Sequence, residues 1–502
     1  MKLKNLFSSS VICILIQILT GCSSQESKLP NIIIFLADDL GYADVKWTNP
    51  KAYIETPNLI QLAKRGAILT DFYSASTMCS PSRAGLLTGR TPTRTGVHDW
   101  IKESYKQPYS DVHLPPEEIT IAEILKNAGY QTAVMGKWHL NNGFRSGNQS
   151  DPDNQGFNYW FCTTVQSEPS HRNPVNFFEN GNPVGEIGTE EDPLFSSGIV
   201  AEKTIKWLKG RKKGAPFFLY IAFHEPHVVC DAPDDLKNKY LDKISKGEIP
   251  LLENTGPHGL GQAEYYACVE NMDHAIGKII SCLREEKELE NTLILFTSDN
   301  GPDSNRYFQE RLQSVGETGI FKGRKRWLYE GGIRQASIIV WPKVIKEGTK
   351  IQQEMGHIDI LPTICEITGQ TVPHDRWIDG INILPALRGQ LLDRSEKPLH
   401  WHFYSPPGDS PRSVLREGPW VLTADWDQPR PSGRFDTSYV HIIKQAKLMD
   451  YKLYNITEDP GQQTNIQDEY PEIFVRMCEK LKELHSSVVK ECPSSTQFQF
   501  HN

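Results

Sequence analysis

The isoleucine-rich apolar run over residues 31–37 (NIIIFLA) is the feature that most constrains the fold of this chain. Apolar residues at consecutive positions, rather than at every second one, are typical of a strand buried on both faces, as in a parallel sheet covered by helices. Two further runs of this kind occupy residues 217–222 and 293–297. We therefore expect several strands of one central sheet that is covered on both sides.

Helical patterns alternate with these strands. A helix opens at Thr56, which a proline follows, and ends near Gly66, because proline is favoured in the first turn of a helix. A helix over residues 119–127 leads into a strand over residues 131–135, and a long helix over residues 263–283 precedes another strand. This alternation predicts an α/β fold with a central mixed, largely parallel sheet sandwiched by helices.

The pattern changes near Pro398, where short strand-like runs separated by turn residues begin. They include residues 400–404 and 420–423, and residues 472–486 have the pattern of a closing amphipathic helix. The sequence thus predicts a large domain over residues 30–390 and a smaller C-terminal α+β subdomain over residues 391–495.

The N-terminal residues have the pattern of an export signal. A basic start, Lys2 and Lys4, precedes an apolar run over residues 11–19 that is too short to span a bilayer comfortably. The following L-T-G-C, which ends at Cys22, resembles a bacterial lipobox, where the chain is cut before the cysteine and the thiol is acylated. We expect a signal peptide over residues 1–21, a lipid anchor in the membrane at Cys22 and a tether over residues 22–29. The alternative is a plain secretory signal.

Export of this kind predicts a protein that is lipid-anchored in a bacterial envelope, in the periplasm or at the cell surface. The formal net charge of -8 over 502 residues is not the basic balance of a nucleic-acid-binding protein, so no nucleic-acid partner is expected. Of the ten cysteines, Cys13 would leave with the signal peptide and Cys22 would be lipidated. The other eight show no C-x-x-C spacing, and we expect most of them to be small buried apolar residues.

Polar residues gather where the predicted strands end. In chain order they are Asp38 and Asp39, Lys137 and His139, His227, and Asp299 and Asn300. Because open α/β sheets bind ligands at the carboxyl ends of their strands, we expect these side chains to form one composite site.

The aspartates and the asparagine of this set offer only oxygen ligands. Such a set suits a hard divalent cation, calcium or magnesium, rather than zinc. Each pair alone is also typical of a simple turn, Asp38-Asp39 before Gly41 and Asp299-Asn300 before Gly301. Two such pairs, each at a strand end, favour the metal site.

Cys79 precedes residues 82–88, which have the pattern of a short helix. A group at a helix N-terminus lies near free backbone N–H donors and the positive end of the helix dipole, and both favour anions. An unmodified thiol there would be an activated nucleophile. One cysteine among eight is otherwise more often structural.

The residues from Cys79 to Arg83 form a C-x-P-x-R motif, which AGLLTGR follows. This segment resembles the signature of the formylglycine-dependent sulfatases, in the alkaline-phosphatase-like superfamily, of the bacterial polysaccharide sulfatase type. Further motifs occur in the order of that family: NIIIFLADDLG from residue 31, GKWH from residue 136, HEPH from residue 224, TSDNG from residue 297, and Lys325 with YEGGIR from residue 329. The ordered set is far more specific than C-x-P-x-R alone, and it implies an alkaline-phosphatase-like fold and sulfate-ester hydrolysis.

The resemblance also implies roles for single residues. The ligands of a metal ion, usually Ca²⁺ and less often Mg²⁺, would be Asp38, Asp39, the modified Cys79, Asp299 and Asn300. The nucleophile would be formylglycine (3-oxoalanine), which a maturation enzyme makes from Cys79. Sulfate would be held by Arg83, Lys137 and Lys325, and protons would be transferred by His139 and His227. Lys322 is an alternative to Lys325, which its spacing to Glu330 favours, and His224 either lines the pocket or lies behind it.

The chemistry of a sulfate ester accounts for these residue types. The ester is an anion, so a metal and a cluster of cations must neutralise it before a nucleophile can approach. One hydroxyl of hydrated formylglycine would attack sulfur while His227 protonates the leaving oxygen. The second hydroxyl would then lose a proton towards His139, and sulfate would be released. The residue types therefore match the implied reaction.

We expect the substrate to be a sulfated carbohydrate, such as a glycosaminoglycan or the algal polysaccharides ulvan and carrageenan. Tryptophans near the candidate loops offer faces on which a sugar ring could stack: Trp100, Trp160, Trp401 and Trp426. Two alternatives stay open. One is a phosphodiesterase or phosphonate monoester hydrolase with the same nucleophile, and the other is a glycan-binding lipoprotein without turnover.

Overall fold

The structure is a computed structural model that describes residues 29–101, 112–145, 149–253, 255–303, 314–430 and 440–493. The predicted signal peptide, Cys22 and nearly all of the predicted tether lie outside the described residues. Among the helices of the described part, none is both long and apolar enough to cross a membrane.

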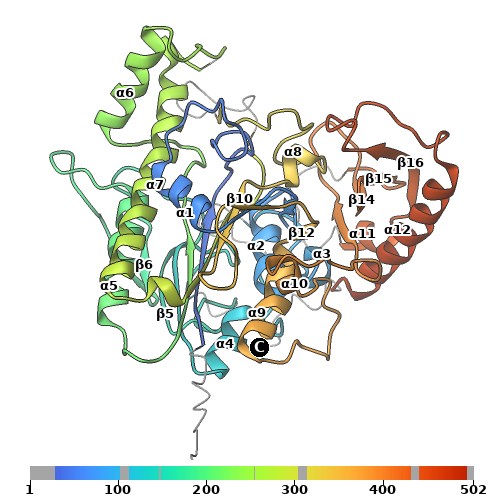
Figure 1. Cartoon of the computed structure of the whole chain (residues 1–502), viewed down its shortest axis with the longest axis horizontal. Coiled ribbons are helices and arrows are strands. Elements are labelled where there is room, and N and C mark those ends of the chain that lie inside the picture. Colours follow the sequence, from blue (N-terminus) through green and yellow to red (C-terminus); the bar gives the residue numbers. More distant parts are fainter. Residues whose placement is uncertain are drawn as a thin grey trace, which may run out of the picture.

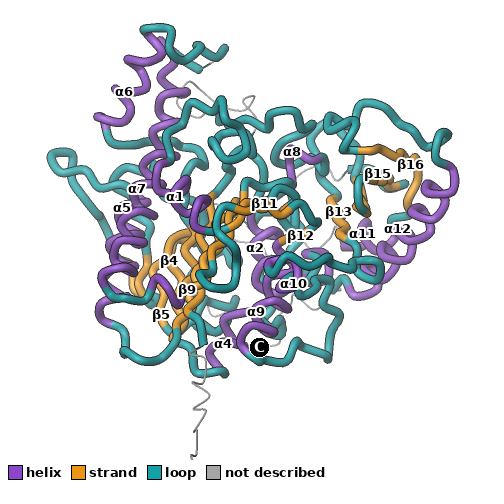
Figure 2. The backbone as a smooth tube through the Cα atoms, viewed as in Figure 1, coloured by secondary structure: helices purple, strands orange, loops and turns teal. Residues whose placement is uncertain are grey.

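A ten-stranded sheet runs through the larger part of the molecule in the order β11-β2-β10-β9-β1-β8-β4-β5-β6-β7 (Figures 1 and 2). Its strands are β1 (Asn31–Ala37), β2 (Ala67–Leu69), β4 (Gln131–Lys137), β5 (Tyr159–Thr163), β6 (Phe178–Glu179), β7 (Asn182–Pro183), β8 (Phe217–Ala222), β9 (Thr292–Ser298), β10 (Ser337–Val340) and β11 (Thr349–Ile351). The central strands β9, β1, β8, β4 and β5 are parallel, whereas β10 pairs antiparallel with β9 and β2. The prediction of a mixed, largely parallel sheet is confirmed.

Helices cover both faces of this sheet. One face carries α1 (Pro57–Arg65), α5 (Ser196–Gly210) and α7 (Leu260–Glu285), and α6 (Asp234–Ser245) packs on α7 (Figure 1). The other carries α2 (Cys79–Thr88), α4 (Ile121–Asn127), α9 (Ile360–Thr368) and α10 (Leu384–Leu387), with the short α3 (Pro92–Thr95) beside α2. Smaller elements complete this part: β3 (Phe72–Tyr73), β12 (Met355–Gly356), α8 (Glu330–Ile333) and the 3₁₀ turns η1 (Pro257–Gly259), η2 (Leu289–Asn291) and η3 (His357–Asp359).

The side chains of β1 show why its sequence is apolar without interruption. Successive side chains of a strand point to opposite faces of the sheet. Ile33 and Phe35 lie in the core beneath α1, α5 and α7, whereas Ile32, Ile34 and Leu36 lie in the core beneath α2, α4 and α9. Both cores thus need an apolar residue from this strand at nearly every position.

The C-terminal part forms a separate four-stranded antiparallel sheet. Its strands are β13 (Leu399–Phe403), β14 (Arg412–Glu417), β15 (Trp420–Trp426) and β16 (Leu448–Asn455), and it is accompanied by α11 (Val440–Gln445) and α12 (Pro471–Glu491). One face packs on α12 through residues such as Leu422 and Leu481, and the other packs on Tyr73 and Ile333 of the larger part. A smaller C-terminal α+β unit is confirmed, while the boundary at residue 390 remains a prediction.

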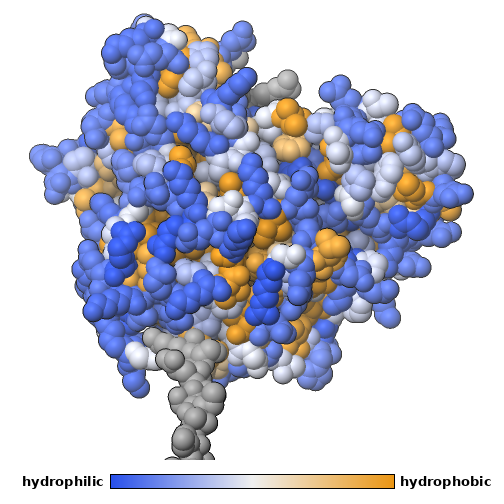
Figure 3. Space-filling model, in the orientation of Figure 1, coloured by the Kyte–Doolittle hydropathy of each residue, from blue (hydrophilic) through white to orange (hydrophobic). Residues whose placement is uncertain are grey.

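The face of the molecule seen in Figure 3 is mixed in hydropathy. Figure 3 shows a face that is largely hydrophilic, with apolar residues in scattered areas over its central part. Apolar atoms contribute a large share of the surface of folded proteins in general.

Candidate active site

The candidate site begins where β1 ends. Asp38 donates its backbone N–H to the carbonyl of Glu225, 3.0 Å away, and Asp39 donates its own to Oδ1 of Asp299, 3.2 Å away. Asp39 has a φ of 67°, in the left-handed region that residues other than glycine seldom adopt. The chain therefore turns sharply directly after the strand and leaves both carboxylates at the carboxyl edge of the sheet.

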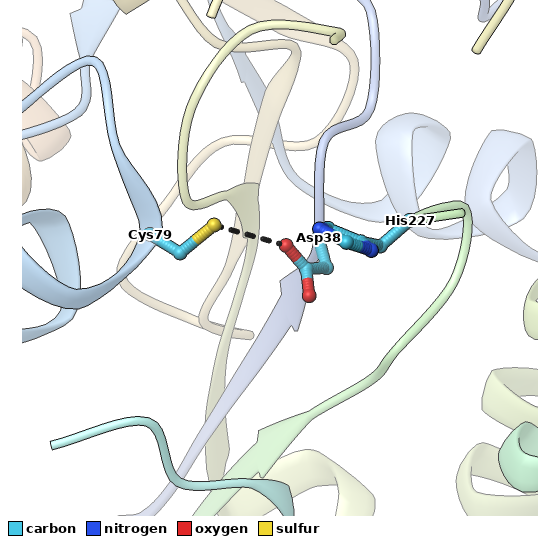
Figure 4. Close-up of side chains that lie close together, drawn as sticks. All are labelled: Asp38, Cys79 and His227. Atoms are coloured by element: carbon cyan, nitrogen blue, oxygen red, sulfur yellow. Dashed lines mark hydrogen bonds between the residues drawn. The ribbon is translucent and has the colours of Figure 1, made fainter. Parts of the chain in front are cut away.

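Four candidate ligands lie together at this edge. One side-chain atom each of Asp38, Asp39, Cys79 and Asp299 lie within 4.8 Å of one another, and all four residues are buried. The Sγ atom of Cys79 lies 3.5 Å from Oδ1 of Asp38 and 3.9 Å from Oδ1 of Asp39. Figure 4 shows Cys79 and Asp38 pointing toward each other, with His227 beside Asp38.

Asn300 completes the set. Its Nδ2 donates to Oδ1 of Asp39 at 2.6 Å, whereas its Oδ1 is buried and has no hydrogen-bond partner among the described residues. A buried oxygen without a partner is costly in a folded protein, and a bound cation would satisfy it. The donor set, mostly carboxylate and amide oxygens, fits a hard divalent cation.

Three cations surround the three carboxylates. Lys137 Nζ lies 2.6 Å from Asp38 Oδ2, and Lys325 Nζ lies 2.6 Å from Asp39 Oδ2. Arg83 contacts Oδ2 of Asp299 through Nε at 3.0 Å and Nη2 at 2.7 Å. Because buried ions are tolerated only when they are paired, this arrangement keeps a highly charged site compatible with the fold.

Burial raises the pKa of each carboxyl here, and neighbouring charges decide the net direction. For Asp38 this effect is outweighed by the nearby cations, Lys137 first, so its pKa is held well below the usual range. For Asp39 the ion pair with Lys325 opposes burial only in part, and the pKa stays raised. Burial and the charge of Asp38 raise the pKa of Asp299 to about 7. A further positive charge at the site would favour ionisation of all three.

Helix α2 positions Cys79 and Arg83. The two residues are four apart, so they share one face of the helix, and Arg83 Nη1 donates to the carbonyl of Lys137 at 2.8 Å, which ties α2 to the end of β4. The prediction that the helix begins at residue 82 was wrong: α2 begins at Cys79, which is therefore in its first turn. The regular helix therefore extends through the whole C-x-P-x-R motif.

Burial raises the pKa of the Cys79 thiol well above its ordinary value, and the nearby lysines offset this only in part. The sequence pattern alone predicted an activated thiolate at a helix N-terminus. In the structure burial outweighs the two lysines, and the charges of Asp299 and Asp38 add to its effect, so the neutral thiol is favoured. The unmodified residue is thus a poor nucleophile.

The two predicted proton-transfer histidines are each influenced by a different lysine, His139 by Lys137 and His227 chiefly by Lys325. His139 directs Nε2 to the carbonyl of Ile101 at 2.8 Å, so Nε2 carries the proton and the buried Nδ1, which has no partner in the described part of the chain, keeps a lone pair. Burial, then Lys137, holds its pKa well below the usual range. His227 places Nε2 3.7 Å from Asp39 Oδ2, and burial, then Lys325, lowers its pKa to about 3.

Of the two lysines considered as sulfate ligands, the structure places Lys325 in the acidic cluster and Lys322 outside it. Lys322 donates to the carbonyl of Gln462 at 3.2 Å and lies 4.4 Å above the ring of Tyr329, away from the carboxylates. His224 hydrogen-bonds Thr163 Oγ1 at 2.8 Å. These contacts give Lys322 and His224 structural partners outside the acidic cluster.

Sequence reasoning missed two charged residues at the edge of this cluster. Asp303 lies 3.8 Å from Lys325 Nζ, and Arg326 pairs with both oxygens of Asp303. The Arg326 side chain is 24% exposed, unlike Lys325 at 3%. Their positions beside the T-S-D-N-G motif and beside Lys325 were the available signals.

The expectation about stacking tryptophans was wrong for three residues. Trp160, Trp401 and Trp426 are 1%, 3% and 5% exposed, because they fill the cores of the two sheets. Trp100 is 43% exposed. Of these four side chains, Trp100 alone is exposed.

Comparisons with known proteins agree with this geometry. A family model described as Sulfatase matches residues 30–370. N-acetylgalactosamine-6-sulfatase of Homo sapiens is 29% identical over 495 residues, covering 94% of this chain and 88% of that protein, and steryl-sulfatase of Homo sapiens is 30% identical, covering 78% and 75%. The solved structure of Ps i-CgsB in complex with k-i-k-neocarrahexaose has the same fold, with a TM-score of 0.75 at 22% identity over 94% of this chain and 95% of that one. The chain belongs to the sulfatase family, whose enzymes hydrolyse sulfate esters.

Proposed function

We propose that this sulfatase hydrolyses the sulfate esters of a sulfated carbohydrate, with a nucleophile made from Cys79. The observation that carries the proposal is the position of Cys79 Sγ, 3.5 Å from Asp38 Oδ1 in a buried cluster of three carboxylates and three cations. Burial disfavours the thiolate of the unmodified cysteine, which supports a catalytic role gained by modification rather than by ionisation.

The proposed modification is formylglycine, whose hydrated form supplies two hydroxyl groups on one carbon, one for attack on sulfur and one for release of the sulfate. A maturation enzyme that acts on the C-x-P-x-R motif would be the partner that installs it. Pro81 and Arg83 of the motif are buried in α2, so that enzyme would act before the chain folds. The maturation enzyme would then not need to reach the motif in the folded protein.

The proposed metal ligands are the residue at position 79 and the four oxygen ligands beside it: Asp38, Asp39, Asp299 and Asn300. Bound there, Ca²⁺ would neutralise the carboxylates and polarise the nucleophile. We favour calcium over Mg²⁺, because calcium tolerates irregular geometry and many protein oxygens, whereas magnesium demands near-octahedral geometry and usually keeps several waters.

The cations of this chain bind and orient the sulfate group. An ammonium has three N–H donors, so Lys137 and Lys325 can each keep one carboxylate and still donate to a sulfate oxygen. Arg83 contributes a fixed fork of donors from one turn after position 79. Together they stabilise the charge that builds up on the sulfate oxygens during transfer.

The two histidines divide the proton transfers. His227 hydrogen-bonds the carbonyl of Val228 through Nδ1, so its Nε2 carries a proton only when the ring is charged. An anionic sulfate close to Nε2 would raise the low pKa of this ring and let it protonate the leaving oxygen. His139 presents a lone pair on Nδ1, which suits it to accept a proton from the second hydroxyl.

A carbohydrate is the substrate class that the relatives and the edge of the site favour. N-acetylgalactosamine-6-sulfatase, named for a sulfated sugar, is similar over almost the whole chain. Trp100 is an exposed aromatic residue and the Asp303–Arg326 pair lies beside Lys325; aromatic and charged side chains are residue types that bind sugar faces and hydroxyl groups. We propose a sulfated polysaccharide or oligosaccharide, such as a glycosaminoglycan, ulvan or carrageenan.

Export and anchoring complete the proposal. The lipobox-like L-T-G-C ending at Cys22 would place the enzyme on a bacterial envelope, in the periplasm or at the cell surface, where large polysaccharides are met. Metabolic labelling with a clickable fatty acid tests this: the native chain should incorporate the label and Cys22→Ala should not.

Substrate assays test the activity. The chain, co-expressed with a formylglycine-generating enzyme, should release sulfate from at least one member of a panel of sulfated sugars. An aryl phosphate diester provides the comparison, because faster cleavage of the diester would assign the site to phosphoester chemistry instead. Release of sulfate from steroid sulfates alone would contradict the carbohydrate assignment.

A further inference from the structure

Two buried thiols lie at the segment that carries His227, one within it and one in the helix packed against it. Cys230 follows His227 by three residues, and Cys268 lies in α7. Cys268 Sγ is 3.3 Å from the carbonyl oxygen of Asp231, the residue next to Cys230, and Cys230 Sγ is 3.4 Å from the carbonyl oxygen of Pro226. Both sulfur atoms thus lie against the backbone of residues 226–231, and after burial it is Cys230 that raises the pKa of the Cys268 thiol.

We infer that Cys230 and Cys268 form a disulfide when the chain folds in the presence of a disulfide oxidant. The thiolate of one cysteine attacks the S–S bond of the oxidant and displaces one thiolate, which takes up a proton. The second cysteine attacks the resulting mixed disulfide and displaces the other. The protein loses two electrons and two protons, and the oxidant is reduced to two thiols. None of the roles proposed for sulfate hydrolysis depends on this bond.

The burial of both thiols determines when the bond forms. Cys230 is 3% exposed and Cys268 is fully buried in the core between the sheet and α7. Burial also raises the pKa of the Cys268 thiol well above its ordinary value, which leaves little thiolate. Exchange with an oxidant therefore takes place during folding, before α7 closes over the segment that follows β8.

The bond would fix the segment that carries His227 from a second side. His171 Nε2 already lies 2.7 Å from the carbonyl oxygen of His227. A link from Cys230 to Cys268 would join the same segment to the longest helix of the larger domain and close a chain loop that contains α6. Such a cross-link stabilises mainly by restricting the unfolded chain.

Refolding with peptide mapping tests the inference. The full chain is reduced and unfolded, then refolded in a buffer of oxidised and reduced glutathione, after which free thiols are alkylated and the chain is digested with trypsin without reductant. The expected tryptic peptides 214–237 and 247–278 contain one cysteine each. We expect them to be linked, with a mass lower than their sum by two hydrogen atoms. The linked species should vanish on reduction and in Cys230→Ser and Cys268→Ser.

Cys282→Ser is the matched control, because Cys282 is also buried in α7 and no contact with another thiol is seen among the described residues. This variant should keep the linked peptide. Recovery of both wild-type peptides in alkylated form, or linked mainly to other cysteines, would overturn the inference.

Thermal unfolding gives a second readout. Reductant should lower the thermal midpoint of the refolded wild-type chain by several degrees and leave the midpoint of the Cys230→Ser/Cys268→Ser double variant unchanged. An equal response of the two proteins would contradict the disulfide.

Discussion

Lys137 Nζ lies 2.6 Å from Asp38 Oδ2, and both side chains are fully buried. Lys325 and Asp39 repeat this relationship at the same distance. In each pair the ammonium compensates a carboxylate that burial alone would neutralise, and it keeps donors for a further anion. The cations that make the acidic cluster compatible with the fold are therefore the same ones that we propose bind sulfate.

The two lysines of the F-K-G-R-K segment should behave differently. Lys325→Ala removes a sulfate donor and leaves Asp39 buried without its cation, so we expect kcat/KM to fall by about 10²–10³-fold. Lys322→Ala is the matched control and should change kcat/KM by no more than about threefold, because Lys322 contacts Gln462 and Tyr329 instead. Equal falls in kcat/KM for Lys325→Ala and Lys322→Ala would contradict the assignment of Lys325 rather than Lys322 as a sulfate ligand.

Calcium should stabilise the folded chain through Asn300. A cation at about 100 times its Kd adds about 2.7 kcal/mol to the free energy of unfolding, which calorimetry detects as a higher thermal midpoint. Asn300→Ala should remove most of this shift, since it deletes a ligand oxygen. Asn271→Ala, which removes a hydrogen bond to Ser197 elsewhere, should keep the shift. A calcium response that Asn300→Ala leaves intact would contradict the proposed ligand set.

Replacement of His139 and of His227 should slow different steps of the reaction. His139→Ala should allow the first release of alcohol and slow the release of sulfate, so rapid-quench assays should show a burst of alcohol of about one equivalent per enzyme. His227→Ala should slow the first step by about 10²–10⁴-fold and show no burst. A burst in His227→Ala and none in His139→Ala would reverse the assignment.

Asp379 should make the interface between the larger part of the molecule and the C-terminal sheet sensitive to acid. It contacts Arg94 at 3.1 Å and His400 of β13 at 3.4 Å. Burial raises the pKa of Asp379, but His400 and Arg94 outweigh this and lower the pKa from 3.8 to about 2. A depressed pKa stabilises the fold above pH 3.8, by about 2 kcal/mol, and this stabilisation is lost as the pH falls towards 2.

Asp379→Asn tests how much stability the Asp379 ion pairs contribute at this interface. At pH 7 the variant should unfold at a lower temperature than the wild type, and the gap should narrow as the pH falls from 4 towards 2. Asp393→Asn is a control at an exposed carboxylate in the same region and should have little effect. A gap that stays constant with pH would show that the Asp379 ion pairs do not supply the stability.

The sequence predicted the sheet best where both faces of a strand are buried. Residues 217–222 form β8 as predicted, because an apolar run of that length leaves few alternatives. The motifs at strand ends likewise indicated which side chains meet, since parallel strands end at one edge. The structure brings Asp38, Asp39 and Asp299 together there.

Other features depend on contacts that no local pattern encodes. Helix α5 has a mixed composition and was not predicted, because packing of Ile199 and Val200 against the sheet stabilises it rather than any start signal. The choice of Lys325 over Lys322 depends on the direction in which each side chain leaves the loop. The raised pKa of Cys79 depends on burial from several elements, and the helix pattern alone indicated the opposite.

The mass of the peptide that contains Cys79 tests the central claim most directly. Trypsin should release residues 66–83, which contain this one cysteine. After co-expression with a formylglycine-generating enzyme, we expect a species about 18 Da lighter than the thiol form, and sulfate release should rise in proportion to its fraction. Cys79→Ser should be folded and inactive. Full turnover by a preparation in which residue 79 is entirely unmodified would contradict the account.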